Sequence, residues 1–353
     1  RSYRRPFSVT DFCLSVVNFS YLSRYYLVLR MKAIVLAGGH ATRLWPITKD
    51  RAKPLLPLGE EKPIIDYILK DLDEEVDEAL ISTNEKFADD FRDYINEYDR
   101  NARVVVEDQD SEEEKPGTIG AIINLIEKED LDDDLVVIGG DNIYSFETSD
   151  FLDFCREKDG PANVVFDVKD EEIASNIGVV DLDGDQIVDF VEKPEEPPST
   201  LGSIAVYYFP QDKVSLFNEY EEHFKQTDVP ADQYLDEPGR LIEWAHKQTP
   251  TYAYSFDGYW FDVGTPRGYL DAFETVVDGS INKADNSVKN SEIGENVFIM
   301  EGVELEDAKI EDSIIFPEAR ISNSDIRSSI IDQKSEIENM DINDAVIGEH
   351  TTL

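Results

Sequence analysis

Cysteine and histidine are scarce in this chain of 353 residues, which has two of the first and four of the second. Cys13 and Cys155 are too few for a disulfide framework, so we expect free thiols in a reducing compartment. Only His40 lies in a patterned stretch, and it has no neighbour at the spacing of a zinc site. Disulfide-rich folds and zinc modules are therefore disfavoured.

Basic residues are also scarce, because 33 Lys and Arg face 77 Asp and Glu, which gives a formal net charge of -44. This charge excludes general affinity for nucleic acid and for anionic membranes, since both are polyanions. It suits a protein in concentrated salt, where the Debye length shrinks to about 3 Å at 1 M and self-repulsion is screened. With 41% hydrophobic residues the chain is globular, and we expect a halophilic cytoplasmic protein.

Residues 1–30 depart from this composition, with five arginines and one acid. Their apolar part is about long enough to span a bilayer, but Arg24 interrupts it. The pair Arg4 and Arg5 is similar to a twin-arginine signal, yet no small-residue cleavage site follows. We interpret Met31 as the biological start and residues 1–30 as a non-native or disordered extension. A membrane-associated arm is the alternative.

From Met31 onward, strand-like and helix-like segments alternate. The expected strands are 33–37, 77–83, 102–108 and 133–141, and the expected helices are 64–72, 85–98 and 118–130. Repeated β-α-β units predict an α/β fold, Rossmann-like, with a doubly wound and mostly parallel sheet. Ligands bind such sheets at the carboxyl ends of strands, so the loops after 37 and 139 should lie near one another.

The stretch 34–58, IVLAGGHATRLWPITKDRAKPLLPL, places four of the scarce cations behind a glycine pair. Gly38 and Gly39 let backbone N–H groups approach a ligand closely, because they have no Cβ. Arg43 and Lys53 can then donate to phosphate oxygens. Neither a Walker A loop nor a GxGxxG fingerprint is present. From these residues alone, an ordinary strand-to-loop turn with solvated basic side chains stays open as the alternative.

This stretch resembles the signature of the sugar-1-phosphate nucleotidyltransferases, whose usual form is LAGGxGTRLxPLTxxxPKPLLPV. Four further motifs of that family follow in order: KPGTIGAI (115–122), VVIGGDN (136–142), IGVVDLD with VEKP (177–183 and 191–194), and GYWFDVGTPRGYLDA (258–272). The resemblance spans residues 31–275 and implies a catalytic domain there. It implies that an NTP and a sugar 1-phosphate give an NDP-sugar and pyrophosphate, by in-line attack on the α-phosphorus.

The resemblance also implies residue roles. Arg43 and Lys53 match the catalytic cations, with Arg43 on the leaving pyrophosphate and Lys53 on phosphate oxygens. Asp141 and Asp262 match the pair that holds Mg²⁺, which prefers carboxylate and phosphate oxygens. The nucleotide-binding positions are Leu36, Gly38, Gly39, Thr42, Gly117 and Thr118, where Gly117 leaves room for the nucleobase. The sugar-phosphate-binding positions are Gly178, Glu192 and Lys193, with Lys193 on the phosphate.

Two departures from the family pattern stand out. Ala41 replaces a glycine of the signature, so the loop must form without one. Ile204 and Ala205 stand where many members have a hydroxyl and a glycine near the sugar. The second departure leaves the identity of the sugar open, though not the class of reaction.

Beyond residue 280 the pattern changes. From Ile315, isoleucines recur in steps of 6, 5, 5, 6, 5 and 5 residues, separated by small polar residues. This period predicts a short β-helix over 280–353, and the resemblance implies that it is parallel and left-handed. An irregular β-rich tail is the alternative. We interpret this part as an assembly or regulatory surface.

The favoured function is synthesis of an NDP-sugar from dTTP or UTP and glucose 1-phosphate, with Mg²⁺, by a homo-oligomer with no nucleic-acid or membrane partner. A non-catalytic nucleotide-sugar sensor is disfavoured by the intact Arg43, Lys53, Asp141 and Asp262. A bifunctional enzyme with C-terminal acyl transfer is disfavoured because His350 is the only histidine of the repeat region.

A chain that begins at Met31 is predicted to be folded and active in concentrated salt, because residues 1–30 show no sustained period of 2 or 3.6 that would give them a core face. Circular dichroism and an activity assay on both lengths check this. Loss of folding or of activity in the shorter chain would contradict it.

Overall fold

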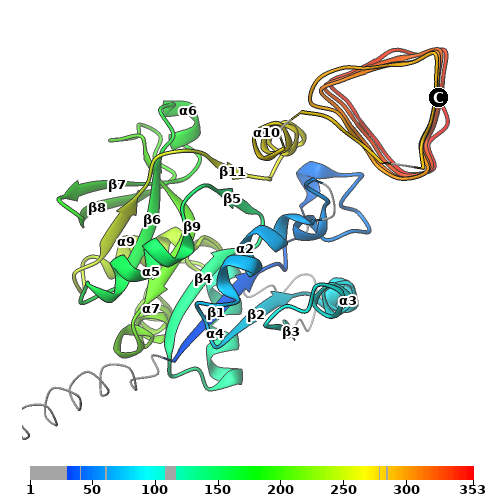
Figure 1. Cartoon of the computed structure of the whole chain (residues 1–353). Helices are drawn as coiled ribbons and strands as arrows, with labels where there is room; N and C mark the ends of the chain where they lie inside the picture. Colours follow the sequence, from blue (N-terminus) through cyan, green and yellow to red (C-terminus); the bar gives the residue numbers. More distant parts are fainter. Residues whose placement is uncertain (1–29, 40, 60–61, 108–116, 278, 284) are drawn as a thin grey trace, which may run out of the picture.

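Figure 1 shows the computed structural model of the chain, which describes residues 30–39, 41–59, 62–107, 117–277, 279–283 and 285–353. Of residues 1–30, which we expect to be a non-native or disordered extension, the structure describes only Arg30. His40 also lies outside it.

The core is a nine-stranded sheet in the order β3-β2-β1-β4-β9-β6-β10-β8-β7. Its first four strands are parallel neighbours: β1 (Met31–Leu36), β2 (Glu78–Thr83), β3 (Ala102–Val106) and β4 (Asp134–Gly139). These elements and the helices between them confirm the doubly wound α/β arrangement that the sequence predicts.

The second half of the sheet is mixed. Its strands are β6 (Ala162–Asp167), β7 (Gly178–Asp183), β8 (Gln186–Glu192), β9 (Leu201–Phe209) and β10 (Tyr252–Ser255). β6 and β10 are parallel, whereas β9 runs antiparallel to both β4 and β6. β7 and β8 form a hairpin whose turn contains Gly184 at φ +63°. A short turn can join β7 and β8 without a crossover helix because they are antiparallel.

Helices cover both faces of this sheet (Figure 1). One face packs against α2 (Ile64–Leu72), α3 (Ala88–Tyr98) and α5 (Thr148–Arg156). The other packs against α4 (Gly117–Glu129), α7 (Leu216–Lys225) and α9 (Pro238–Ala245). Within β1, Ala33 and Val35 enter the first core and Ile34 the second. The strand therefore reads as a continuous apolar run because both of its faces are buried.

Shorter elements complete the catalytic part. They are η1 (Thr42–Leu44), η2 (Lys53–Leu55), η3 (Glu85–Phe87), η4 (Gln211–Lys213), α6 (Glu171–Ala174), α8 (Ala231–Tyr234), α10 (Pro266–Val276), β5 (Asn142–Tyr144) and β11 (Trp260–Asp262). β5 and β11 pair antiparallel in a small sheet of their own. Among the residues that the structure describes, no helix is both long and apolar enough to cross a bilayer.

The C-terminal part is a parallel β-helix, seen end-on as a triangle in Figure 1. Its first side is β12 (Ile281–Asn282), β15 (Phe298–Ile299), β18 (Ile314–Ile315), β21 (Ile330–Ile331) and β24 (Val346–Ile347). Its second side is β13 (Ser287–Lys289), β16 (Glu304–Glu306), β19 (Arg320–Ser322) and β22 (Glu336–Glu338). Its third side is β14 (Glu292–Ile293), β17 (Lys309–Glu311), β20 (Asp325–Arg327) and β23 (Ile342–Asn343).

The steps of 6, 5 and 5 in the sequence are the three sides of one coil. Ile315 pairs with Ile331, which is 16 residues later, and Ile331 pairs with Ile347 after another 16. Among the described residues, the corners between sides hold residues with left-handed backbone, which are Asn290, Asn296, Gly302, Asp307, Asp312, Glu318, Asn323, Ser328, Lys334, Asn339, Asp344 and His350. Asp and Asn, which tolerate this conformation better than most residues, fill seven of these twelve corners. The repeat therefore depends on its corner residues as much as on its isoleucines.

One side of the β-helix packs against the catalytic part. Phe298 stacks on Phe273 of α10 with ring centroids 5.4 Å apart, and Ile314 and Ile330 extend the same apolar cluster. This cluster also contains Leu44 and Ile47 of the signature stretch, Val263 and Tyr269. The first side therefore has isoleucines on both faces, one row in the coil interior and one row at the interface.

The last coils also contact the signature stretch between Arg43 and Lys53. The Arg51 guanidinium lies 4.7 Å from the centre of the Phe316 ring, and its Nη1 is 3.4 Å from Asp332 Oδ1. A Cβ on Gly348 would come within 2.8 Å of Pro46 Cγ, so glycine is needed for this close approach. The β-helix thus supports the loop that carries the predicted catalytic cations.

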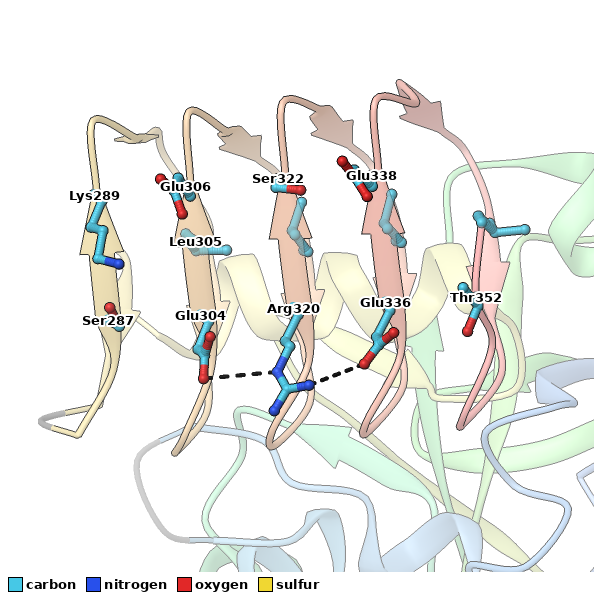
Figure 2. Close-up of a pocket in the computed structure, with 13 residues that line it drawn as sticks. Ser287, Lys289, Glu304, Leu305, Glu306, Arg320, Ser322, Glu336, Glu338 and Thr352 are labelled. Atoms are coloured by element: carbon cyan, nitrogen blue, oxygen red, sulfur yellow. Dashed lines mark hydrogen bonds and ion pairs between the residues drawn. The ribbon is translucent and has the colours of Figure 1, made fainter.

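A second side of the β-helix faces outward and carries charge. Figure 2 shows Glu304, Arg320 and Glu336 in one row across neighbouring strands, with Arg320 between the two glutamates. Arg320 Nη1 is 3.0 Å from Glu336 Oε1, and its Nε is 3.8 Å from Glu304 Oε1. These exposed side chains form ion pairs across neighbouring strands, and such pairs of opposite charge stabilise a sheet face that is exposed to solvent.

Ile326→Ala is predicted to lower the free energy of unfolding by about 2 to 5 kcal/mol, because Ile326 is fully buried in the coil interior and its loss leaves a cavity. Chemical denaturation in concentrated salt measures this. Val288→Ala is the matched control, since Val288 is 39% exposed and lies on the β13 strand of the same β-helix; a loss of similar size in the control would contradict the assignment of Ile326 to the core.

Candidate active site

The loop after β1 lies beside the loop after β4, as the sequence predicts. Gly140 N donates to Leu36 O at 2.9 Å, so the end of β1 is joined to the turn before Asp141. Thr83 Oγ1 donates to Ala37 O, and Asn84 Nδ2 donates to Gly38 O, both at 3.2 Å. The end of β2 therefore fixes the backbone of the glycine loop.

The two glycines of this loop differ in what surrounds them. A Cβ on Gly38 would lie 2.3 Å from Glu107 Oε1, whereas a Cβ on Gly39 would meet nothing within 4 Å. Glu107 Oε1 accepts from Ser82 Oγ at 3.0 Å. A side chain at position 38 would therefore displace the Glu107 carboxylate, while Gly39 borders open space where a ligand can approach its backbone.

The signature loop forms without glycine at position 41 because Ala41 itself takes the left-handed conformation, at φ 47° and ψ 42°. Its carbonyl oxygen accepts from Thr48 Oγ1 at 2.8 Å and from Leu44 N at 3.0 Å. These two bonds hold a backbone conformation that costs an alanine about 1 kcal/mol or more. Thr42 and Arg43 follow directly, and both side chains are exposed.

Lys53 lies between the two aspartates that the sequence pairs. Its ammonium group contacts Asp141 Oδ2 and lies 3.7 Å from Asp262 Oδ1. Lys53 begins η2, Asp141 follows β4, and Asp262 ends β11, so three distant segments meet at one point. The structure thus places both predicted metal ligands around one ammonium group.

The pairing of β5 with β11 brings the two aspartates together. Asp262 is the pairing partner of Asn142, and Val263 N donates to Asp141 O at 3.1 Å. Trp260 Nε1 donates to Asn142 Oδ1 at 2.7 Å, while Asn142 Nδ2 donates to Gly139 O at 3.0 Å. The sequence motifs do not single out Asn142, because its contact with Trp260 joins residues that are 118 positions apart.

The electrostatics of this group favour a cation between the carboxylates. Burial and the neighbouring charge of Asp141 raise the pKa of Asp262, and Lys53 and Arg43 partly offset this. Burial lowers the pKa of Lys53, but attraction to Asp141 and Asp262 outweighs it, so the pKa of Lys53 is raised overall. The Lys53 ammonium group therefore stands where a cation shared by both carboxylates would be stabilised.

The two aspartates fit a Mg²⁺ ion whose remaining coordination positions would be filled by substrate and water. Both aspartates supply hard oxygen ligands, which Mg²⁺ prefers, and the Lys53 ammonium already serves as their common cation. Within the described ranges, no third Asp, Glu, His or Cys joins this pair as a candidate ligand. Phosphate oxygens and water would therefore fill the remaining positions.

The predicted nucleobase positions begin helix α4. Gly117 has φ +72°, and a Cβ there would come within 2.5 Å of Leu235 O. Ile119 N donates to the same oxygen at 2.7 Å, just after Thr118. Besides its predicted role of leaving room for a nucleobase, glycine at position 117 allows the backbone to pass close to the connection between α8 and α9.

The predicted sugar-phosphate residues lie on the β7–β8 hairpin. Gly178 pairs with Glu192, and Cβ atoms on Gly178 and Gly239 would lie 2.7 and 1.8 Å from Glu192 Oε2. Two missing side chains therefore make the space that the Glu192 carboxylate occupies. Lys193 follows with a left-handed backbone at φ 47°, and its ammonium group pairs with Glu237.

Residues 32–279 match the family model described as nucleotidyl transferase. The chain belongs to the nucleotidyl transferase family. The match spans every residue of the site described above, and it confirms the resemblance that the signature and its four companion motifs carry.

Its relatives are named as sugar-1-phosphate nucleotidyltransferases. The glucose-1-phosphate adenylyltransferase of Clostridium novyi is 31% identical over 332 residues, which is 83% of this chain and 83% of that protein. A putative mannose-1-phosphate guanyltransferase of Sulfolobus acidocaldarius is 31% identical over 242 residues, covering 68% of this chain and 61% of that protein. The names of these relatives differ in both nucleobase and sugar.

A solved structure is similar over the catalytic part. It is a putative glucose-1-phosphate thymidylyltransferase from Bacillus anthracis in complex with sucrose, with TM-score 0.60 and 27% identity, covering 72% of this chain and 97% of that chain. The enzyme class is thereby established for this member of the nucleotidyl transferase family, while the roles of its individual residues stay predictions.

Glu192, one of the residues predicted to bind the sugar phosphate, is a pH-sensitive group. Burial raises the pKa of Glu192 to about 7, and the charge of Glu237 adds to this effect. Because the folded-state pKa lies above the ordinary value of 4.5, this group's contribution to stability is complete below about pH 4.5. The contribution is lost as pH rises through about 7, where the folded protein must bury an ionised carboxylate.

Glu192→Gln is therefore predicted to remove a pH dependence. The difference in unfolding free energy, wild type minus variant, should fall between about pH 5 and pH 8. Denaturation at several pH values in constant salt measures it. A difference that stays level or rises with pH would show that the Glu192 carboxyl is not buried in its neutral form.

Proposed function

We propose that this chain catalyses transfer of a nucleotidyl group from an NTP to a sugar 1-phosphate, releasing pyrophosphate. The observation that carries the proposal is the meeting of Lys53, Asp141 and Asp262 beside the glycine loop. In a chain with net charge -44, two polyanionic substrates need a local group of cations and backbone donors. Arg43 and Lys53 supply the cations, and Gly39 supplies the unobstructed backbone.

The reaction needs no protein nucleophile. An oxygen of the sugar phosphate forms a bond to the α-phosphorus of the NTP, the bond from that phosphorus to the β-phosphate oxygen breaks, and pyrophosphate leaves with the electron pair. The protein therefore acts by positioning the two phosphates in line and by stabilising the charge of the transition state.

Each residue has a part in that positioning. Arg43 holds the β- and γ-phosphates and stabilises the pyrophosphate as it leaves. Lys53 donates to phosphate oxygens once substrate competes for it with Asp141. Asp141 and Asp262 would hold Mg²⁺, which when bound would neutralise negative charge on the phosphates. Lys193 binds the sugar phosphate, and Glu192 binds sugar hydroxyls.

For the finer specificity we propose dTTP or UTP as the nucleotide and glucose 1-phosphate as the sugar. The printed names of the C. novyi and B. anthracis relatives support glucose 1-phosphate, and that of the B. anthracis protein supports a pyrimidine nucleotide. We further propose that the enzyme works as a homo-oligomer in the cytoplasm at high salt, where the acidic surface stays screened.

The test of this function is pyrophosphate release, measured in concentrated KCl with Mg²⁺ for dTTP, UTP, ATP, GTP and CTP against several sugar 1-phosphates. The expected result is turnover with dTTP or UTP and glucose 1-phosphate. Turnover with ATP or GTP alone would overturn the nucleotide assignment. Absence of turnover with every pair would overturn the function itself.

Arg43→Ala is predicted to lower kcat/KM by about 10² or more, because it removes a charge partner of the transition state. Steady-state kinetics with the best substrate pair check this. Arg92→Ala is the control, since Arg92 is an exposed arginine of α3 whose ion pair is with Asp89. Near-wild-type turnover in a folded Arg43 variant would remove Arg43 from the mechanism.

A further inference from the structure

Lys193, the cation on the sugar side, is already paired in the substrate-free structure. Its ammonium group contacts Glu237 Oε1, and Glu237 Oε2 lies 3.2 Å from Arg240 Nε. One carboxylate therefore holds two cations, one on each oxygen. The side chain of Lys193 is 47% exposed and that of Glu237 is 26% exposed, so the pair can be reached by a ligand from solvent.

The backbone of Lys193 is fixed, which leaves only its side chain to choose a partner. The residue has a left-handed backbone, its N–H donates to Ile177 O at 3.2 Å, and the next residue is the buried Pro194. A turn fixed on both sides sets the position of its Cα. Rotation about the side-chain bonds decides whether the ammonium group meets Glu237 or an incoming phosphate.

The Glu237 carboxylate has both of its oxygens directed at cations. The residue precedes α9 at the N-cap position, and its side chain makes no hydrogen bond to the first N–H groups of the helix. Its carboxylate instead pairs with Lys193 through Oε1 and with Arg240 through Oε2.

A second carboxyl group lies beside this position. The Glu192 carboxylate lies against Gly239 at the start of the same helix, and the charge of Glu237 contributes to the raised pKa of Glu192. A sugar phosphate that reaches Lys193 thus meets a lysine that is already neutralised and two carboxyl groups. It competes with Glu237 for the ammonium group.

We propose that Glu237 is a positioning residue that masks Lys193 as an ion pair until a sugar 1-phosphate displaces it. This inference rests on the proposed function, in which Lys193 binds the sugar phosphate. The mask lowers the affinity of Lys193 for free anions such as inorganic phosphate and pyrophosphate. A sugar 1-phosphate overcomes it because its hydroxyl groups are held at the same time by the sugar-binding residues.

The test is the Glu237→Gln variant, which keeps the size of the side chain and removes its charge. We expect KM for the sugar 1-phosphate to fall about two- to fivefold, the range that partly exposed ion pairs produce, while KM for the NTP stays unchanged. Binding of inorganic phosphate, measured by calorimetry at fixed ionic strength, should tighten by a similar factor. Should this variant not fold, Glu237→Ser repeats the test with a residue that suits an N-cap.

Two controls separate masking from a general change of charge. Glu243→Gln removes one negative charge from the same helix, at 4.0 Å from Arg240 Nη1, and should leave phosphate affinity unchanged. In a Lys193→Ala background, Glu237→Gln should have no further effect on phosphate affinity, because masking acts only through Lys193.

Each other result overturns the proposal. A higher KM for the sugar 1-phosphate in Glu237→Gln would show that Glu237 supports Lys193 instead of masking it. An equal change in Glu243→Gln, or a change that persists without Lys193, would show a long-range charge effect. If the wild type turns over no NTP and sugar phosphate pair, the proposed function fails by itself, and the calorimetric comparison still decides whether Glu237 masks Lys193.

Discussion

The shared contact of Lys53 with Asp141 and Asp262 is the interaction on which the rest of the site depends. Three segments that are far apart in sequence converge there, and each is supported by a different part of the fold. The parallel half of the sheet places Asp141, the β5–β11 pair places Asp262, and the β-helix supports the stretch before Lys53. An acidic protein can keep such a cation fixed because the carboxylates around it are mutually repulsive without it.

The excess of carboxylates also accounts for where charged side chains lie and what they pair with. Most acidic side chains lie on the surface, where they pair locally or are solvated, as in the row of Glu304, Arg320 and Glu336. Two cations near the site are paired with carboxylates: Lys53 is shared by Asp141 and Asp262, and Lys193 contacts Glu237. In the function that we propose, a substrate of high negative charge competes with a protein carboxylate at each of these two cations.

Local patterns predicted the elements of this fold well, because local patterns determine them. The apolar run at 33–37 lies at a strand that is buried on both faces, and the helix expected at 64–72 has those bounds. The steps between isoleucines gave the three sides of the β-helix coil.

The antiparallel half of the sheet did not follow from the β-α-β pattern, since β9 enters between β4 and β6 from a later part of the chain. Contacts such as Trp260 with Asn142 and Lys193 with Glu237 join residues with no shared motif, so no sequence pattern announces them. Ala205 is similar: its left-handed backbone in β9, at φ 56°, marks an irregularity that an alanine does not suggest.

The contacts of Arg51 with Asp332 and of Pro46 with Gly348 also fix how long the β-helix can be before that point. Neighbouring coils are about 4.8 Å apart, so each added or deleted coil moves everything after it by that distance along the axis. A duplication of 16 residues between β15 and β18 would preserve every corner and every isoleucine column, yet it would carry Asp332 away from Arg51. The loop that contains Pro46 and Arg51 therefore sets how many coils can precede the coil that contains Asp332.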